Sequence, residues 1–304
     1  MDLLSISCNE RAEILKHYGV SEEQVKEDVE LIKSWKQKQP HLPENTSDDF
    51  IARVLLRNKF RVERTKEKLD NYYTLRGYHD ALVRDFENIV PSKHFIQSIF
   101  STHLPLPKLT PNYERVIIMK LINTDIEVYD MLELIKLDLA VTEVTMQYDG
   151  SIGVRYVIDF GGFTLRHLAK WNPLLLNKHV TLIEKAYSCR IMGFHCINVP
   201  DFATNILGLL KIVLRAKIYD KLKINSSLES LYEVIPKECL PSEYGGSCSN
   251  IPSLLKKWDE VFQNHRNFFV ENYKNVSMEH LRTADLDKSD SFGPDGTFKR
   301  LTID

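Results

Sequence analysis

Apolar residues recur at helical spacing in the first part of the chain. Ser21-Glu22-Glu23-Gln24 can cap a helix, and apolar positions follow it at helical intervals as far as Trp35. After a break at 40–47 a second helix is predicted, and a third covers 62–78. We therefore expect residues 1–90 to fold as a bundle of helices.

The pattern changes after Pro91, where apolar runs alternate with longer amphipathic segments. The apolar runs predict strands at 115–122, 154–160, 191–199 and 222–224. The amphipathic segments predict helices at 127–146, 172–187 and 202–217. Strands that alternate with helices of this length are typical of a mainly parallel sheet covered by helices. The sequence therefore predicts an α/β domain over residues 91–280, followed by a polar, turn-rich tail at 281–304.

Composition narrows the cellular compartments and the binding partners that we expect for this protein. Of the 304 residues, 40 are basic and 42 are acidic, and the net charge is −2. This balance provides no overall attraction to nucleic acid, so an anionic partner requires a local patch. The start of the chain lacks the basic segment of a signal peptide, and no stretch has the roughly 18 apolar residues of a spanning helix. The five cysteines form no CxxC pair and are expected to be reduced thiols. We expect a cytoplasmic protein.

One segment contains a catalytic signature of protein kinases. Asp159-Phe160-Gly161 reproduces the triplet that holds magnesium in those enzymes. A kinase also requires a Gly-rich loop and an upstream HRD-type loop, and the chain has neither. The only His-Arg pair, His265-Arg266, lies downstream and lacks the Asp. We interpret the triplet as the end of a strand, where Asp159 accepts backbone N–H groups of the turn.

Other candidate chemistry is equally incomplete. His195-Cys196 lies in an apolar strand, where the two side chains point to opposite faces, and packing in the core is the simpler interpretation. The acidic side chains of the 127–146 helix are interpreted as a solvated face; they are Glu127, Glu133, Asp138 and Glu143. The sequence predicts no enzyme, no metal site and no cofactor.

The segment 202–223 combines an apolar stripe with positive charge. An ordinary core explains the stripe more simply than a ligand cavity does, and both interpretations remain open at this point. Five basic residues stand against the single acidic Asp220, and this excess fits an anionic membrane surface or a phosphate head group. The basic residues are Lys211, Arg215, Lys217, Lys221 and Lys223.

Several segments resemble one family when they are taken in order. IARVLLRNKFRVERTKEKLDNYYTLR at 51–76 is similar to its N-terminal region, and VRYVIDFGGF at 154–163 is similar to one of its strands. Asn172-Pro173, GFHCINVPDF at 193–202 and LPSEYGGS at 240–247 follow in the same order. From about 48 to 260 the chain resembles the CRAL-TRIO (Sec14-like) family. Within it, the likeness is to the branch of alpha-tocopherol transfer protein and cellular retinaldehyde-binding protein.

This resemblance implies both a fold and a function. The helical bundle would pack on the α/β domain, and a helix near 199–218 would act as a movable gate over an internal cavity. The cavity would hold a tocopherol-like or retinoid ligand, and opening of the gate at a membrane would release it. The implied partners are a hydrophobic small molecule and an anionic, phosphoinositide-containing membrane, but no nucleic acid. A monomer is expected.

The resemblance also implies site residues. Head groups of phosphoinositides would meet Arg190, Lys217 and Lys221, whereas Met192 supplies no charge at the fourth position. The predicted ligand contacts are Leu134, Leu137, Ile158, Phe163, Leu165, Leu182, Ile183, Tyr187, Ile191, Phe194, Phe202, Ile206, Leu209 and Val213. The family branch is aliphatic where this chain has Trp171 and His179, and it has a small residue in place of Tyr156. These differences predict a reshaped pocket.

Two alternatives share the same architecture. A phospholipid exchange protein would bury a phosphodiester and would need cationic or hydroxyl donors inside the cavity, in which the predicted lining is poor. A scaffold or regulator would leave the cavity empty, and the polar tail is the only feature that favours it.

Overall fold

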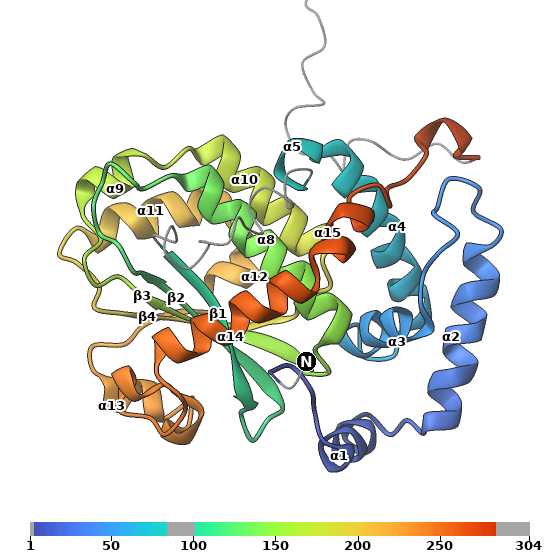
Figure 1. The fold of residues 1–304 in the computed structure, drawn as a ribbon, viewed down its shortest axis with the longest axis horizontal. Coiled ribbons are helices and arrows are strands. Elements are labelled where there is room, and N and C mark those ends of the chain that lie inside the picture. Colours follow the sequence, from blue (N-terminus) through green and yellow to red (C-terminus); the bar gives the residue numbers. More distant parts are fainter. Residues whose placement is uncertain (1–2, 84–100, 284–304) are drawn as a thin grey trace, which may run out of the picture.

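A five-stranded sheet forms the centre of the molecule (Figure 1). The structure is a computed structural model that describes residues 3–83 and 101–283. In spatial order the strands are β1 (Ser101–Leu109), β2 (Glu114–Leu121), β3 (Gly153–Asp159), β4 (Ile191–Ile197) and β5 (Leu222–Ile224). β1 is antiparallel to β2, and every other neighbouring pair is parallel. The predicted α/β class with a mainly parallel sheet is confirmed.

The edge strand β1 was not predicted from the sequence. It contains Pro105 and Pro107, and its register with β2 shifts between Pro105 and Leu109. Proline cannot donate to a sheet, so it is confined to edge strands and bulges, and it interrupts the alternation that marks a strand in a sequence. β1 lies at the edge of the sheet and contains a register shift, so it tolerates its prolines. The same prolines interrupt the alternation, which explains why the sequence pattern did not predict this strand.

Helices make up the described part of the N-terminal region, as predicted. They are α1 (Cys8–Tyr18), α2 (Glu22–Lys36), α3 (Asp48–Arg57), α4 (Val62–Tyr78) and α5 (Asp80–Val83). The expected serine caps are present, since Ser21 accepts from the Gln24 backbone N–H and Ser47 accepts from that of Phe50. The predicted domain boundary at residue 90 lies outside the described residues.

The remaining helices cover the sheet and extend the C-terminal region (Figure 1). Next to the cavity described below are α8 (Met131–Tyr148), α9 (Leu165–Ala169), α10 (Pro173–Thr181), the π-helical turn η1 (Leu182–Ala186), α11 (Ala203–Val213) and α12 (Ala216–Tyr219). The C-terminal elements are α13 (Leu228–Tyr232), η2 (Lys237–Cys239), η3 (Ser242–Tyr244), α14 (Ile251–Asn264), α15 (Arg266–Asn272) and η4 (Glu279–Leu281).

Two predicted helix boundaries were wrong. The helix expected at 127 begins at Met131, because the Asp130 side chain accepts from the first-turn N–H groups of Leu132 and Glu133 and caps it there. The helix expected to reach about 187 is helical to Ala186, since the π-helical turn η1 continues α10 after Thr181. The helix expected at 202–217 ends at Val213, since Leu214 and Arg215 adopt extended backbone angles before α12.

The four acidic side chains of the predicted 127–146 helix were interpreted as a solvated face, and this interpretation was wrong for two of them. Glu127 and Glu133 are exposed, but Asp138 and Glu143 are buried. The reason is that α8 lies between the sheet and the N-terminal helices, so both of its long sides are covered by protein (Figure 1). A periodic pattern in a sequence cannot show that the polar side of a helix is covered by a second domain.

Glu143 joins four separate elements of the structure. It forms an ion pair with Arg76 of α4 (Nε–Oε1 2.8 Å), and both side chains are fully buried. Tyr72 of α4 and Tyr187, which follows η1, each donate a hydroxyl to Glu143 at 2.6 Å, and Asn272 of α15 donates its amide at 3.0 Å. One carboxylate therefore fixes how the helical region sits on the α/β region.

The start of the predicted tail is attached to the body of the protein. The Arg282 guanidinium donates to the Asp70 carboxylate of α4 at 2.8 Å and 2.9 Å, and it also pairs with Glu279 at 2.8 Å. The prediction of a loose tail at 281–304 is therefore wrong for Arg282. The part of that tail beyond Thr283 lies outside the described residues.

We predict that Glu143→Gln lowers the free energy of unfolding by about 3 kcal/mol, because it leaves the buried Arg76 charge without its partner. The matched control is Glu67→Gln on α4, the helix that carries Arg76, where an exposed pair with Arg64 (3.4 Å) is removed and less than about 1 kcal/mol should be lost. Urea unfolding measures both changes. Equal effects for the two variants would contradict the role given to Glu143.

Candidate ligand-binding cavity

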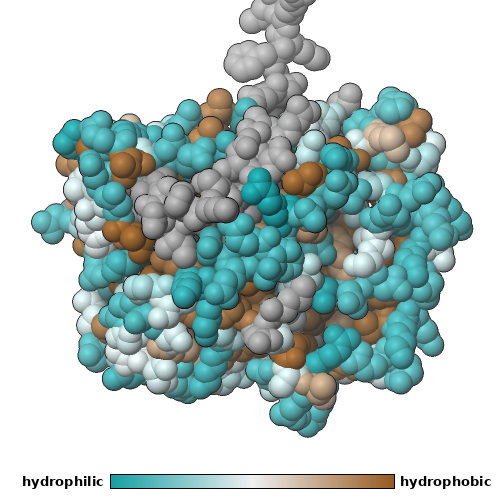
Figure 2. Space-filling model, viewed as in Figure 1, coloured by the Kyte–Doolittle hydropathy of each residue, from teal (hydrophilic) through white to brown (hydrophobic). Residues whose placement is uncertain are grey.

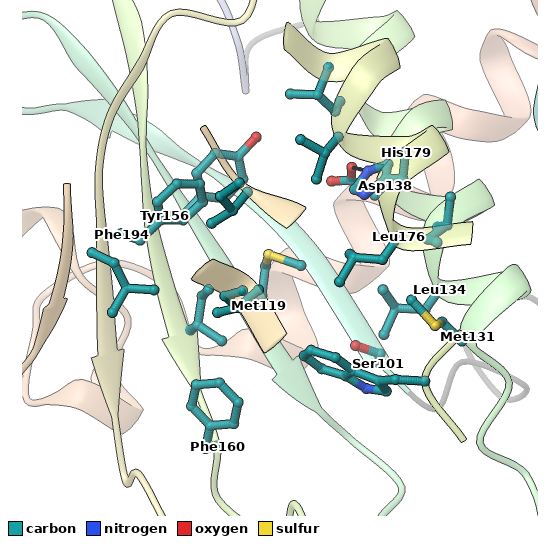
Figure 3. Close-up of a pocket in the computed structure, with 18 of the residues that line it drawn as sticks. Ser101, Met119, Met131, Leu134, Asp138, Tyr156, Phe160, Leu176, His179 and Phe194 are labelled. Carbon is teal, nitrogen blue, oxygen red and sulfur yellow. Dashed lines mark hydrogen bonds and ion pairs between the residues drawn. The ribbon is translucent and has the colours of Figure 1, made fainter. Parts of the chain in front are cut away.

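A cavity of about 210 Å³ lies between the sheet and the helices that cover it. β3 contributes Tyr156, Ile158 and Phe160, which point to the same face because residues two apart on a strand share a side. α8, α10 and α11 provide the opposite wall (Figure 3). An apolar cavity of about 150 Å³ can stay dry and bind an apolar molecule. This cavity is larger, and most of its lining is aliphatic or aromatic.

Six of the predicted ligand contacts line this cavity. They are Leu134, Ile158, Phe163, Ile183, Ile191 and Phe194. Those on β3 and β4 came from the family resemblance, since Ile191 and Phe194 are an odd number of positions apart. Met119 and Leu121 of β2 also line it and were missed, although alternation along that strand places them on one face.

The other eight predicted contacts are not among the lining residues. Leu137, Leu182 and Tyr187 are buried in the main core. Phe202 and Ile206 pack around Phe160. Of the remaining three, Leu165 is 53% exposed, Leu209 is half-buried, and the side chain of Val213 lies outside the described residues.

The gate segment lines the cavity through other side chains than the four predicted. Leu210 of α11, Leu214 after it and Ile218 of α12 line the cavity. The predicted contacts on this segment all precede Leu214, where the backbone leaves the helix. The break therefore affects only the positions after it, Leu214 and Ile218.

The three bulky or polar residues expected to reshape the pocket all line it. The Tyr156 ring stacks on Phe194 with 5.1 Å between ring centroids. Trp171 Nε1 donates to the Tyr129 hydroxyl at 2.8 Å, and both residues belong to the wall. His179 projects from α10 beside Asp138 (Figure 3).

Asp138 places a charge in the wall of the cavity, whose other charged lining residues, among those described, are Lys120, Asp159 and Glu184. His103 Nδ1 lies 2.6 Å from one carboxylate oxygen, and His179 Nε2 contacts the other. Burial alone would raise the pKa of Asp138, but the two imidazoles outweigh burial and hold the pKa well below its ordinary value. Asp138 is therefore an ionised carboxylate enclosed by protein.

Asp159, the acid of the kinase-like triplet, belongs to a structural turn. Its carboxylate accepts from the Gly161 backbone N–H at 2.9 Å, as the sequence predicts, and from Asn198 Nδ2 at 2.7 Å. Lys120 and the Tyr244 hydroxyl occupy the other oxygen, each at 2.9 Å. Among the described residues, no group of three or more metal-ligating side chains is present. The carboxylate is thus saturated by protein donors.

His195 and Cys196 are core residues, as the sequence indicated. His195 is buried, and its Nδ1 lies 3.2 Å from the Asn225 side-chain oxygen. Burial raises the pKa of the Cys196 thiol to about 12, so it is not a thiolate at neutral pH.

Basic side chains from three segments converge on the surface. Arg190 lowers the pKa of Lys59, and Lys217 contributes to the same effect. Burial, followed by Lys217 and Arg190, lowers the pKa of Lys221. Repulsion of this kind shows that the four cations are neighbours, and we call them the basic cluster. Lys59 follows α3 in the helical region, so only the fold reveals that it joins the three residues predicted from the sequence.

Comparison with protein families identifies the α/β region. The model described as "CRAL/TRIO domain" matches residues 100–246, and the model described as "Pinta-like, UBA domain" matches residues 21–87. Residues 100–246 form a CRAL/TRIO domain. This family is known for binding and transferring lipophilic ligands.

Individual proteins are also similar to this chain. The human protein named "Alpha-tocopherol transfer protein-like" is 25% identical over 252 residues, which is 81% of this chain and 72% of that protein. Mouse clavesin-2 is 22% identical over 251 residues, 80% of this chain and 74% of that protein. The solved structure titled "Crystal structure of Sfh5" aligns with 77% of this chain and 91% of that one, at 12% identity and a TM-score of 0.47, which is too weak a likeness to support a conclusion.

In this CRAL/TRIO domain α11 is held by few interactions. Its Ile206 packs over Phe160 and Cys196, and Arg215 after it forms an ion pair with Glu184 at 2.9 Å. The Arg215 side chain is 64% exposed. Ile212 on the outer side of α11 is 82% exposed. The described part of this wall thus combines an exposed apolar residue with an ion pair whose arginine is largely exposed.

The surface around the CRAL/TRIO domain is mainly polar on the face shown in Figure 2, where hydrophobic residues appear only in small groups. None of the helices in the described ranges has the length and apolar character needed to cross a membrane.

Proposed function

We propose that this protein binds one apolar small molecule, a tocopherol-like or retinoid isoprenoid, in the internal cavity and transfers it between membranes. The observation that carries the proposal is the cavity of about 210 Å³ with its mainly aliphatic and aromatic lining. Burial of apolar surface gives roughly 25 cal/mol per Å², so such a ligand leaves only for another apolar host. The proposal describes a monomeric carrier in the cytoplasm that reaches membranes transiently and performs no catalysis.

A phospholipid fits the cavity less well. Its phosphodiester would need unoccupied cationic donors, and Lys120, the only lysine among the described residues of the lining, already pairs with Asp159. This pairing favours a ligand without negative charge.

Membrane docking would use the basic cluster and α11 together. Each Lys or Arg close to an anionic surface contributes about 1 kcal/mol, so four neighbouring cations provide useful attraction to phosphoinositide head groups. The exposed Ile212 lies on α11, which lines the cavity. Insertion of the Ile212 side chain into the membrane would therefore displace α11 from the cavity. Docking and opening would thus be coupled. The relative named alpha-tocopherol transfer protein-like supports this proposal.

The double variant Lys59→Ala with Lys217→Ala should slow ligand transfer to phosphoinositide-containing vesicles by about tenfold, because two of the four attractive charges are lost. Both side chains are exposed, so ligand retention without vesicles should stay unchanged. The control is Lys256→Ala with Lys257→Ala on α14, which removes the same charge from another surface. Fluorescence transfer of α-tocopherol analogues measures the rates. Equal slowing in both double variants would exclude a specific docking surface.

Cys196 reports on movement of α11, under which it is buried. We expect phosphoinositide vesicles to accelerate its modification by N-ethylmaleimide by about tenfold, because opening of the gate exposes the thiol. Cys239 is the control, since it is fully buried away from α11 and its thiol contacts the Leu109 carbonyl. Peptide mass spectrometry separates the two sites. If both thiols react faster together, the vesicles unfold the protein, and if neither does, the gate stays closed.

A further inference from the structure

Most polar groups that line the cavity are occupied by protein partners. Lys120 pairs with Asp159 at 2.9 Å, and Trp171 donates to Tyr129 at 2.8 Å. The Ser101 hydroxyl donates to the Lys120 carbonyl at 3.2 Å. A buried polar group that is satisfied in this way gains little from a ligand. These residues therefore do not select the polar part of a bound molecule.

Glu184 pairs with Arg215 through one carboxylate oxygen, and its other oxygen has no hydrogen-bond partner among the described residues but is closed off by surrounding protein atoms. Tyr156 and His179 differ from the residues above. Tyr156 is only 5% exposed, and within the described residues no hydrogen bond reaches its hydroxyl. His179 uses Nε2 for Asp138, and no partner among the described residues contacts its Nδ1.

Both groups lie at the Asp138 end of the cavity. The Asp138 charge, after burial, contributes to raising the pKa of Tyr156, so the two side chains are close enough to interact. His103, 2.6 Å from Asp138, also has its ring centroid 5.8 Å from that of Tyr156. In Figure 3 the Tyr156 hydroxyl points away from the Phe194 ring, toward the side of the cavity where Asp138 and His179 lie.

Asp138 also determines what His179 offers to a ligand. An ionised carboxylate can only accept hydrogen bonds, so His179 must donate to it from Nε2. In the neutral imidazole the other nitrogen, Nδ1, is then an acceptor. The Tyr156 hydroxyl can donate as well as accept. The cavity thus presents one acceptor and one donor inside an apolar wall.

We propose that Tyr156 and His179 form a recognition site for a ligand hydroxyl, so that the molecule carried in the cavity is a neutral lipid alcohol. The ligand O–H donates to His179 Nδ1, and the ligand oxygen accepts from the Tyr156 hydroxyl. This inference rests on the proposed carrier function and specifies its ligand class. A carboxylic acid is disfavoured, because its ionised carboxylate can only accept hydrogen bonds and cannot donate to His179 Nδ1. An ether cannot donate to His179 and leaves Nδ1 without a partner.

Three probes with the same isoprenoid chain test this site: all-trans-retinol, its methyl ether and all-trans-retinoic acid. Quenching of Trp171, which lines the cavity, reports binding against the background of Trp35 and Trp258. The wild-type protein should bind retinol about tenfold more tightly than the methyl ether, as expected for the loss of one buried hydrogen bond, and should bind the acid least. This comparison needs no variant.

Tyr156→Phe and His179→Leu should each bring the retinol-to-ether affinity ratio toward one while the ether still binds. The matched control, Leu134→Ala, removes an apolar contact from the wall and should weaken all three probes without changing the ratio. Equal affinity of the wild-type protein for retinol and its ether overturns the hydroxyl site and leaves the carrier proposal standing. If neither the retinoids nor α-tocopherol bind, both proposals fail.

Discussion

The arrangement of the whole molecule depends on one buried carboxylate, that of Glu143. Its ion pair with Arg76 is fully enclosed, and the hydroxyls of Tyr72 and Tyr187 complete its hydrogen bonding. Breaking such a pair costs several kcal/mol because the remaining charge is left in a medium of low polarity. The directionality of its bonds also fixes the orientation of α8 against the helical region. Since α8 forms one wall of the cavity, Glu143 positions Leu134 and Asp138 as well.

The two walls of the cavity are therefore held very differently. α8 is fixed by a buried polar network, whereas α11 is held by a small apolar cluster and by the Arg215–Glu184 ion pair, in which the arginine is well exposed. Exposed ion pairs contribute about 0–1 kcal/mol and are weakened by salt. An anionic membrane that attracts Arg215 and the basic cluster competes directly with that ion pair. Under the proposed transfer function, this asymmetry between the walls would favour opening at α11, and the fixed position of α8 would keep the ligand site intact.

How far the sequence predicted the fold and the site depended on whether the signal was local. Helix caps at Ser21 and Ser47 and the alternation on β3 are local, and the corresponding predictions are confirmed in the fold. β1 was missed because its two prolines remove the strand pattern. The burial of Asp138 and Glu143 could not be seen, since charge on a helix ordinarily means solvent. The partners of Asp138 come from β1 and α10, and those of Glu143 include α4 of the helical region. Leu214 and Ile218 line the cavity beyond the end of α11, where the pattern predicted a continuous helix, and Lys59 joins the basic cluster only through the tertiary fold.

The central claim is that the cavity carries an apolar molecule that leaves at an anionic membrane. Organic extraction of the purified protein, followed by mass spectrometry before and after incubation with phosphoinositide-containing vesicles, tests this claim most directly. The account predicts one uncharged isoprenoid per chain before incubation and its appearance in the vesicles afterwards. An empty protein, or a phospholipid that stays bound in the presence of the vesicles, would contradict it.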